Sequence, residues 1–139
     1  MTPAYAQDHD YSAYNVLAVD DIPLNLVLVQ KMLMRFNFQM RVAANGQAAL
    51  DAVALKKPDL ILLDLMMPGI DGFEVIKRLK ENPDTADIRI VVLSALNSNE
   101  DVVKAYSMGA DDFIMKPIIM EKLLTTVITQ MQVIQAIRK

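Results

Sequence analysis

Short apolar runs alternate with longer amphipathic segments along most of this chain. The clearest run is Leu60–Leu63 (LILL), bounded by Pro58 and by Pro68-Gly69. Four apolar residues between turn residues are typical of a strand that is buried on both faces. Together with helical spacing between the runs, this pattern predicts strands over residues 16–19, 39–44, 60–63, 89–93 and 113–115, and helices over residues 23–36, 46–55, 72–80, 99–108 and from 119 onward.

Five predicted strands that alternate with five predicted helices indicate an α/β fold. Such an order favours a parallel sheet whose right-handed crossovers place helices on both faces. Residues 1–14 show neither a helical nor a strand period, so we expect a flexible N-terminal arm followed by one domain over residues 15–139. The last helix stays apolar to Ile137, and three continuations are open: an output domain after residue 139, pairing with a second copy, or an end at this helix.

Composition narrows the classes of function. A chain of 139 residues that is 53% hydrophobic can fill the core of one domain. A net charge of -3 offers no basic surface for phosphate backbones, so we expect a protein or a cation as partner and no direct nucleic-acid binding. The chain has no cysteine, no apolar stretch of membrane-spanning length and no signal-peptide pattern at its start. These features predict a cytoplasmic protein that does not enter the membrane.

Polar residues follow four of the five predicted strands. They are Asp20-Asp21, Asp64, Ser94 and Lys116, and each lies at the C-terminal end of its strand. Because parallel strands place these ends along one edge of the sheet, we expect the side chains to converge on one pocket, where ligands bind in open α/β folds.

Three carboxylates gathered at one edge need a positive partner. At an effective dielectric near 20, each close pair repels by roughly 4 kcal/mol. A divalent cation with hard oxygen ligands offsets this repulsion, and Mg²⁺ suits a site of a few carboxylates completed by waters and a phosphate. Lys116 adds a point charge that suits a phosphate or the carboxylate itself.

These residues resemble the receiver domains of two-component response regulators, the group that includes the chemotaxis regulators. The resemblance covers residues 16–139, and the separations from Asp64 to Ser94 and to Lys116 are those that the family shows. It is carried by Asp20-Asp21, by Asp64 with Met67-Pro68 and Asp71-Gly72, by Ser94-Ala95, and by Phe113 with Lys116-Pro117.

The resemblance implies a fold and a function. The fold would be a flavodoxin-like three-layer αβα sandwich, a doubly wound (βα)5 sheet with strand order 2-1-3-4-5. Asp64 would be the phosphorylation site and take a phosphoryl group from the phosphohistidine of a sensor histidine kinase or phosphotransfer protein. Such a domain is a signalling phosphoacceptor that catalyses only its own phosphorylation and dephosphorylation, rather than a conventional enzyme.

The resemblance also implies roles for the other motif residues. Asp20, Asp21, Asp64 and the backbone carbonyl of Met66 would hold Mg²⁺, with Asp20 acting mainly through water. Lys116 and the Ser94 hydroxyl would each bind a phosphoryl oxygen. Ser94 and Phe113 would form the switch, although many relatives carry tyrosine rather than phenylalanine there. The face made by the fourth helix, fifth strand and fifth helix would change shape and could pair two copies as a homodimer.

The helix predicted over residues 23–36 is apolar on more than one side. Leu28, Met32 and Leu33 can face the sheet, while a second stripe consists of Leu24, Val27 and Met34. The resemblance implies that this stripe docks the kinase; the other interpretation is a helix that is buried more deeply than usual.

Two alternative functions remain open. One is a phosphorylation-independent interaction module on the same fold, which the complete set of site residues disfavours. The other is a flavodoxin-like ligand binder or a metal-dependent hydrolase, because this architecture hosts both. A flavin phosphate loop after the first strand conflicts with Asp20-Asp21, which would repel phosphate unless a metal is bound.

Overall fold

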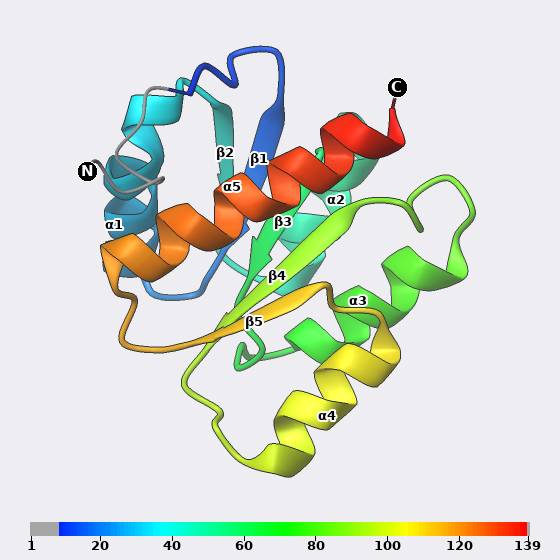
Figure 1. The fold of residues 1–139 in the computed structure, drawn as a ribbon. Coiled ribbons are helices and arrows are strands. Elements are labelled where there is room, and N and C mark those ends of the chain that lie inside the picture. The colour runs from blue at the N-terminus through cyan, green and yellow to red at the C-terminus, as the bar shows by residue number, and fades with distance from the viewer. Residues whose placement is uncertain (1–8, 139) are drawn as a thin grey trace.

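The computed structural model describes residues 9–138 and shows the predicted alternation of strands and helices (Figure 1). Its elements are β1 (Asn15–Val19), α1 (Pro23–Leu33), the 3-10 turn η2 (Met34–Phe36), β2 (Gln39–Ala43), α2 (Gly46–Leu55), β3 (Leu60–Leu63), α3 (Gly72–Glu81), β4 (Arg89–Ser94), α4 (Asn99–Met108), β5 (Asp112–Met115) and α5 (Met120–Ile137).

Within the described residues the strands form one parallel sheet with the order β2-β1-β3-β4-β5. The first strand, β1, therefore lies inside the sheet, with β2 on one side of it and β3 on the other. In open α/β sheets such a switch point leaves a crevice at the C-terminal ends of the two strands. The predicted fold class and strand order are confirmed, and the crevice lies where Asp20 and Asp64 follow their strands.

Two cores lie on opposite faces of the sheet. Alternate residues of each central strand point to opposite faces, so that Ala18 and Leu62 join one core while Val19 and Leu63 join the other. The first core is completed by α1 and α5, and the second by α2, α3 and α4. Figure 1 shows α5 crossing its face of the sheet, and these layers make the predicted three-layer sandwich. Among residues 9–138, none of the helices is both long enough and apolar enough to cross a bilayer.

The N-terminal segment differs from the expected loose arm. Residues 1–8 lie outside the described part of the chain, but the next residues pack on the domain. Tyr11 is only 4% exposed, its backbone N–H donates to the Phe36 carbonyl at 2.8 Å, and its ring stacks on Phe38 with centroids 5.3 Å apart. Periodicity could not predict this contact, because single aromatic side chains rather than a repeating pattern hold the segment in place.

The α-helix predicted over residues 23–36 is shorter in the structure. Regular α-helix stops at Leu33, a 3-10 turn follows, and Asn37 adopts a left-handed conformation with φ 62°. Asparagine tolerates this conformation better than most residues, and it turns the chain into β2.

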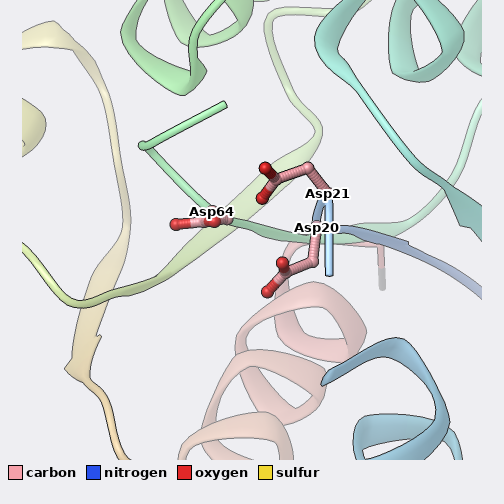
Figure 2. A group of neighbouring side chains, drawn as sticks. All are labelled: Asp20, Asp21 and Asp64. Atoms are coloured by element: carbon pink, nitrogen blue, oxygen red, sulfur yellow. The ribbon is translucent and has the colours of Figure 1, made fainter. Parts of the chain in front are cut away.

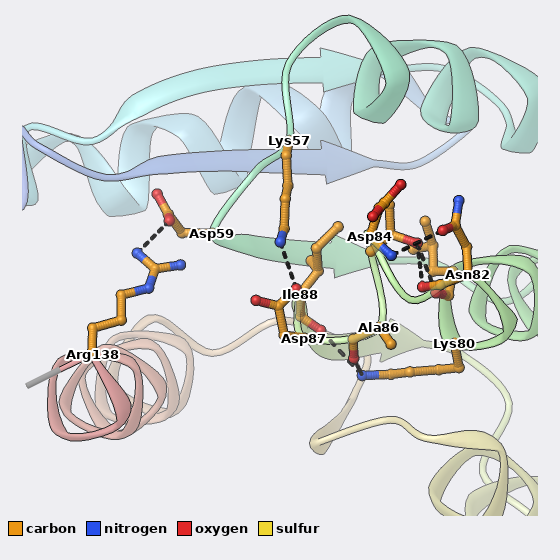
Figure 3. A network of polar contacts seen from close by, with 11 residues as sticks. Lys57, Asp59, Lys80, Asn82, Asp84, Ala86, Asp87, Ile88 and Arg138 are labelled. Carbon is orange, nitrogen blue, oxygen red and sulfur yellow. Dashed lines mark hydrogen bonds and ion pairs between the residues drawn. The ribbon is translucent and has the colours of Figure 1, made fainter.

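Ion pairs lie at the end of the sheet where the strands begin, opposite the crevice (Figure 3). Arg138 lies 2.6 Å from Asp59 Oδ1, and the backbone N–H of Asn15 donates to Asp59 Oδ2 at 2.8 Å. Nearby, Lys57 lies 2.6 Å from Asp87. Asp59 therefore connects the start of β1 and the start of β3 to the residue that follows α5.

Candidate functional site

Three carboxylates meet at the crevice. Asp20 and Asp21 follow β1 and Asp64 follows the neighbouring strand β3, and each offers one oxygen within 4.8 Å of the others (Figure 2). The backbone N–H of Asp64 donates to the Val19 carbonyl at 3.0 Å, so strand pairing continues to the carboxylate and fixes its position. Asp20 and Asp64 are buried while Asp21 is exposed. The predicted convergence of these residues is thus present in the structure.

Lys116 reaches the same cluster from β5. Its backbone N–H donates to the Ser94 carbonyl at 2.8 Å, which extends the β4–β5 pairing to this residue. The ammonium lies 2.8 Å from Asp20 Oδ2 and 3.6 Å from Asp64 Oδ2. The lysine therefore offsets the charge of two buried carboxylates, and its closer contact is with Asp20.

The environment of Asp64 disfavours its charged form. Burial raises the pKa of this carboxyl, and the charges of Asp20 and Asp21 act in the same direction. The Lys116 ammonium and the backbone N–H of Met66, which donates to Asp64 Oδ1 at 3.2 Å, lower the pKa but do not cancel the effect of burial. A further cation at this point would favour the ionised carboxylate.

Asp20 is held by donors that the sequence pattern did not reveal. Its Oδ1 accepts the backbone N–H of Ile22 at 2.9 Å, and its Oδ2 accepts the Asn25 side-chain amide at 3.1 Å. Asn25 was absent from the predicted site because it lies inside α1 rather than at a strand end. The available signal was a polar residue on the first turn of α1, between the apolar residues Leu24 and Leu26.

The loop after Asp64 depends on a close approach of α3. A Cβ atom on Gly72 would overlap the Asp64 carbonyl oxygen and lie 2.7 Å from Leu65 Cα. Asp71 caps α3 by accepting the Glu74 N–H at 2.9 Å. The Asp71-Gly72 pair therefore starts a helix directly against the end of β3, and it fixes the loop that carries Met66.

Ser94 is the last residue of β4, and Phe113 lies on the neighbouring strand β5. Ser94 is fully buried at the end of β4, and its hydroxyl oxygen accepts the Leu96 backbone N–H at 3.2 Å. Phe113 is half-buried and packs on the core that α4 covers. Phe113 also pairs with Val92, two residues before Ser94 on the neighbouring strand.

The cluster fits a hard divalent cation. Its ligand atoms are carboxylate oxygens from Asp20, Asp21 and Asp64, two of them on buried side chains. Oxygen-only ligands favour Mg²⁺, Mn²⁺ or Ca²⁺ over metals that prefer nitrogen and sulfur. Because the three carboxylates carry more charge than Lys116 can neutralise, the residues present can accept such an ion.

Comparison with known proteins agrees with this geometry. Residues 16–128 match the model of the response regulator receiver domain. The response regulator PleD of Caulobacter vibrioides is 42% identical over 103 residues, which cover 74% of this chain and 23% of PleD. The chain thus spans about a quarter of the length of this curated relative.

Solved structures show the same fold. A signal receiver domain of a signal transduction histidine kinase from Syntrophus aciditrophicus is 33% identical, with a TM-score of 0.79 and coverage of 86% of this chain and 90% of that one. The Mn²⁺-bound form of the response regulator Rcp1 is 29% identical, with a TM-score of 0.73 and coverage of 82% and 88%. With the carboxylate cluster at the crevice of a five-stranded parallel sheet, these matches show that the chain belongs to the response regulator receiver domains, the phosphoacceptor modules of two-component signalling.

Proposed function

We propose that Asp64 is the phosphoacceptor of this domain. A receiver domain implies a histidine kinase as partner, and the donor is a phosphohistidine on that kinase or on a phosphotransfer protein. The observation that carries the proposal is the position of Asp64, which lies at the end of a buried strand with Asp20, Asp21 and Lys116 around it.

The chemistry needs only positioning and charge neutralisation. A carboxylate oxygen of Asp64 attacks phosphorus, the phosphorus–nitrogen bond breaks, and the imidazole nitrogen of the donor keeps the electron pair. No general base is required once the carboxylate is ionised. Lys116, which lies 3.6 Å from Asp64 Oδ2, can approach an oxygen of the transferred group.

We propose Mg²⁺ as the physiological ion, held by Asp20, Asp21, Asp64 and the backbone carbonyl of Met66. The oxygen-only ligand set supports this choice, as does the Mn²⁺ bound by the related Rcp1. When bound, the ion supplies positive charge against the phosphoryl oxygens. The chain's own residues orient the ion and keep Asp64 facing the donor.

We also propose that Ser94 and Phe113 transmit the modification. The Ser94 hydroxyl oxygen, which accepts the Leu96 N–H, would move so that its O–H donates to a phosphoryl oxygen, and the Phe113 ring would follow. The face of α4, β5 and α5 is then the proposed output surface, through which a homodimer or a following output domain would respond. A cytoplasmic location fits a chain without cysteine.

Phosphorylation itself gives the direct test of the function. We expect the purified domain to gain the mass of one phosphoryl group when it is incubated with Mg²⁺ and acetyl phosphate, because the site supplies both the nucleophile and the charge neutralisation. Intact-mass spectrometry measures the gain, and a chelator should prevent it. A mass that stays unchanged with acetyl phosphate and with a phosphorylated histidine donor would support the phosphorylation-independent interaction module instead.

The apolar stripe on α1 and η2 supports a docking surface for the donor. Leu24, Val27 and Met34 are 65%, 43% and 67% exposed, so the interpretation of a deeply buried helix is wrong. The expectation that Leu28 faces the sheet is also wrong, since it is 39% exposed and Leu26 and Val29 are buried instead. Leu24 and Val27 lie on the half of α1 that begins at the crevice, and exposed apolar side chains there suit a protein that must approach Asp64.

Val27→Glu tests this docking surface. We expect phosphotransfer from a phosphorylated histidine protein to slow by roughly tenfold, which is about 1.4 kcal/mol, because a charge would be buried at the contact. Phosphorylation by acetyl phosphate should keep its rate, since a small donor does not touch α1. Leu55→Glu, at a position that is 86% exposed on α2, is the matched control. Equal rates for Val27→Glu and wild type with the protein donor would contradict the assignment.

A further inference from the structure

Three donors from different parts of the chain converge on Asp20. The Ile22 N–H occupies Oδ1, whereas Asn25 Nδ2 and Lys116 Nζ share Oδ2 at 3.1 and 2.8 Å. One donor on Oδ2 is neutral and fixed to α1, and the other is charged and lies at the tip of a flexible side chain. This oxygen therefore links α1 to the residue that follows β5.

The Lys116 ammonium is not equally close to the two carboxylates. Its ammonium is 2.8 Å from Asp20 and 3.6 Å from Asp64, so in this structure it is bound mainly to Asp20. A lysine that contacts a phosphoryl group on Asp64 has to loosen its bond to Asp20. Asp20 is only 5% exposed, and among the described residues the loss of Lys116 leaves Asn25 as the donor on Oδ2.

We propose that Asn25 is a positioning residue that holds Asp20 while Lys116 moves to the phosphoryl group. This inference rests on the proposed role of Asp64. The Asn25 amide stays on Oδ2 when the ammonium leaves, so the buried carboxylate keeps its orientation and a donor on each oxygen. Asn25 thereby lowers the cost of releasing Lys116 and acts on phosphoryl binding without touching the phosphoryl group.

Asn25→Leu separates this role from a merely structural one. Leucine has the same branching and the same number of heavy side-chain atoms, favours a helix more than asparagine does, and removes the amide donor. We expect the affinity for beryllium fluoride at saturating Mg²⁺ to fall about tenfold, because Lys116 is then the only donor left on Oδ2. The affinity for Mg²⁺ alone should change by less than about threefold, since we expect Lys116 to stay on Asp20 until a phosphoryl-like group is bound.

Two variants complete the comparison. Asn25→Gln keeps a side-chain amide and should restore at least part of the beryllium fluoride affinity. Gln30→Ala, on the same helix and away from the carboxylates, should match wild type in both titrations. Calorimetry gives the Mg²⁺ affinity, and amide NMR spectra follow the titration with beryllium fluoride.

The chemical reactivity of Lys116 gives an independent measurement on the metal-free protein. In Asn25→Leu the ammonium is bound more tightly to Asp20, so a small amine-acylating reagent should modify Lys116 several-fold more slowly than in wild type, as read by peptide mass spectrometry. Equal labelling of Lys116 in the two proteins would overturn the proposal, as would equal losses of Mg²⁺ and beryllium fluoride affinity. If wild type binds no beryllium fluoride, the function proposed for Asp64 fails, and the labelling rates still decide the role of Asn25.

Discussion

Asp64→Asn is expected to abolish phosphorylation and, at the same time, to make the metal-free domain more stable. The amide cannot act as the nucleophile, so the mass gain with acetyl phosphate should disappear entirely. The gain in stability has a separate cause. The substitution removes one negative charge from a cluster in which Asp20 and Lys116 are also largely buried.

The sign of the stability change follows from the pKa of Asp64. Burial raises this pKa above the ordinary value of 3.8, so the folded state binds the proton more tightly than the unfolded state. The stability linked to this group is fully present below 3.8 and is lost as the pH rises through the raised folded pKa. At neutral pH the wild type therefore carries a penalty that asparagine lacks.

Thermal unfolding with a chelator at pH 7 measures this effect. We expect Asp64→Asn to raise Tm by roughly 3 °C, which corresponds to about 1 kcal/mol for a domain of this size. The difference from wild type should narrow as the pH is lowered through the raised pKa, because the wild-type carboxyl then becomes neutral as well. Asp84→Asn, an exposed position far from the crevice, is the control for both measurements. Phosphorylation that persists in Asp64→Asn would place the acceptor elsewhere.

The sequence predicted the sheet and the site because both depend on short patterns. A run such as Leu60–Leu63 is typical of a strand that is buried on both faces. A parallel sheet then places Asp64 and Asp20 at the same edge. Topology thus brought together residues far apart in the chain. The expectation needed no knowledge of side-chain conformation, since strand ends alone determined it.

Contacts that depend on individual side chains could not be predicted in this way. The burial of Tyr11 against Phe36 comes from ring packing outside any repeating pattern. The bond from Asn25 to Asp20 depends on how α1 is rotated about its axis, as does the exposure of Leu28. Periodicity gives such a rotation only loosely when a helix is apolar on more than one side.

In contrast to Asp64→Asn, Lys116→Met should destabilise the domain. It should be the most damaging single change at the site. It removes the ammonium that lies 2.8 Å from Asp20 and 3.6 Å from Asp64 and leaves two buried carboxylates without a cation. Breaking a buried ion pair from one side costs about 3–5 kcal/mol, and we expect the lower end because Asp20 keeps its bonds to Ile22 and Asn25. Thermal unfolding with a chelator at pH 7 measures the loss, and Lys122→Met on the exposed side of α5 is the control.

Added Mg²⁺ should restore much of this stability, because an ion that binds only the folded state stabilises it in proportion to the logarithm of its concentration. Lys116→Met should not bind beryllium fluoride even with Mg²⁺ present, since the Mg²⁺ ion cannot replace the lysine at a phosphoryl oxygen. The two distances also predict how the charges are coupled. In double-mutant cycles Lys116 should couple more strongly to Asp20 than to Asp64 in the metal-free domain, because the closer contact is with Asp20. Stronger coupling to Asp64 would mean that the lysine already occupies its phosphoryl-binding position before phosphorylation.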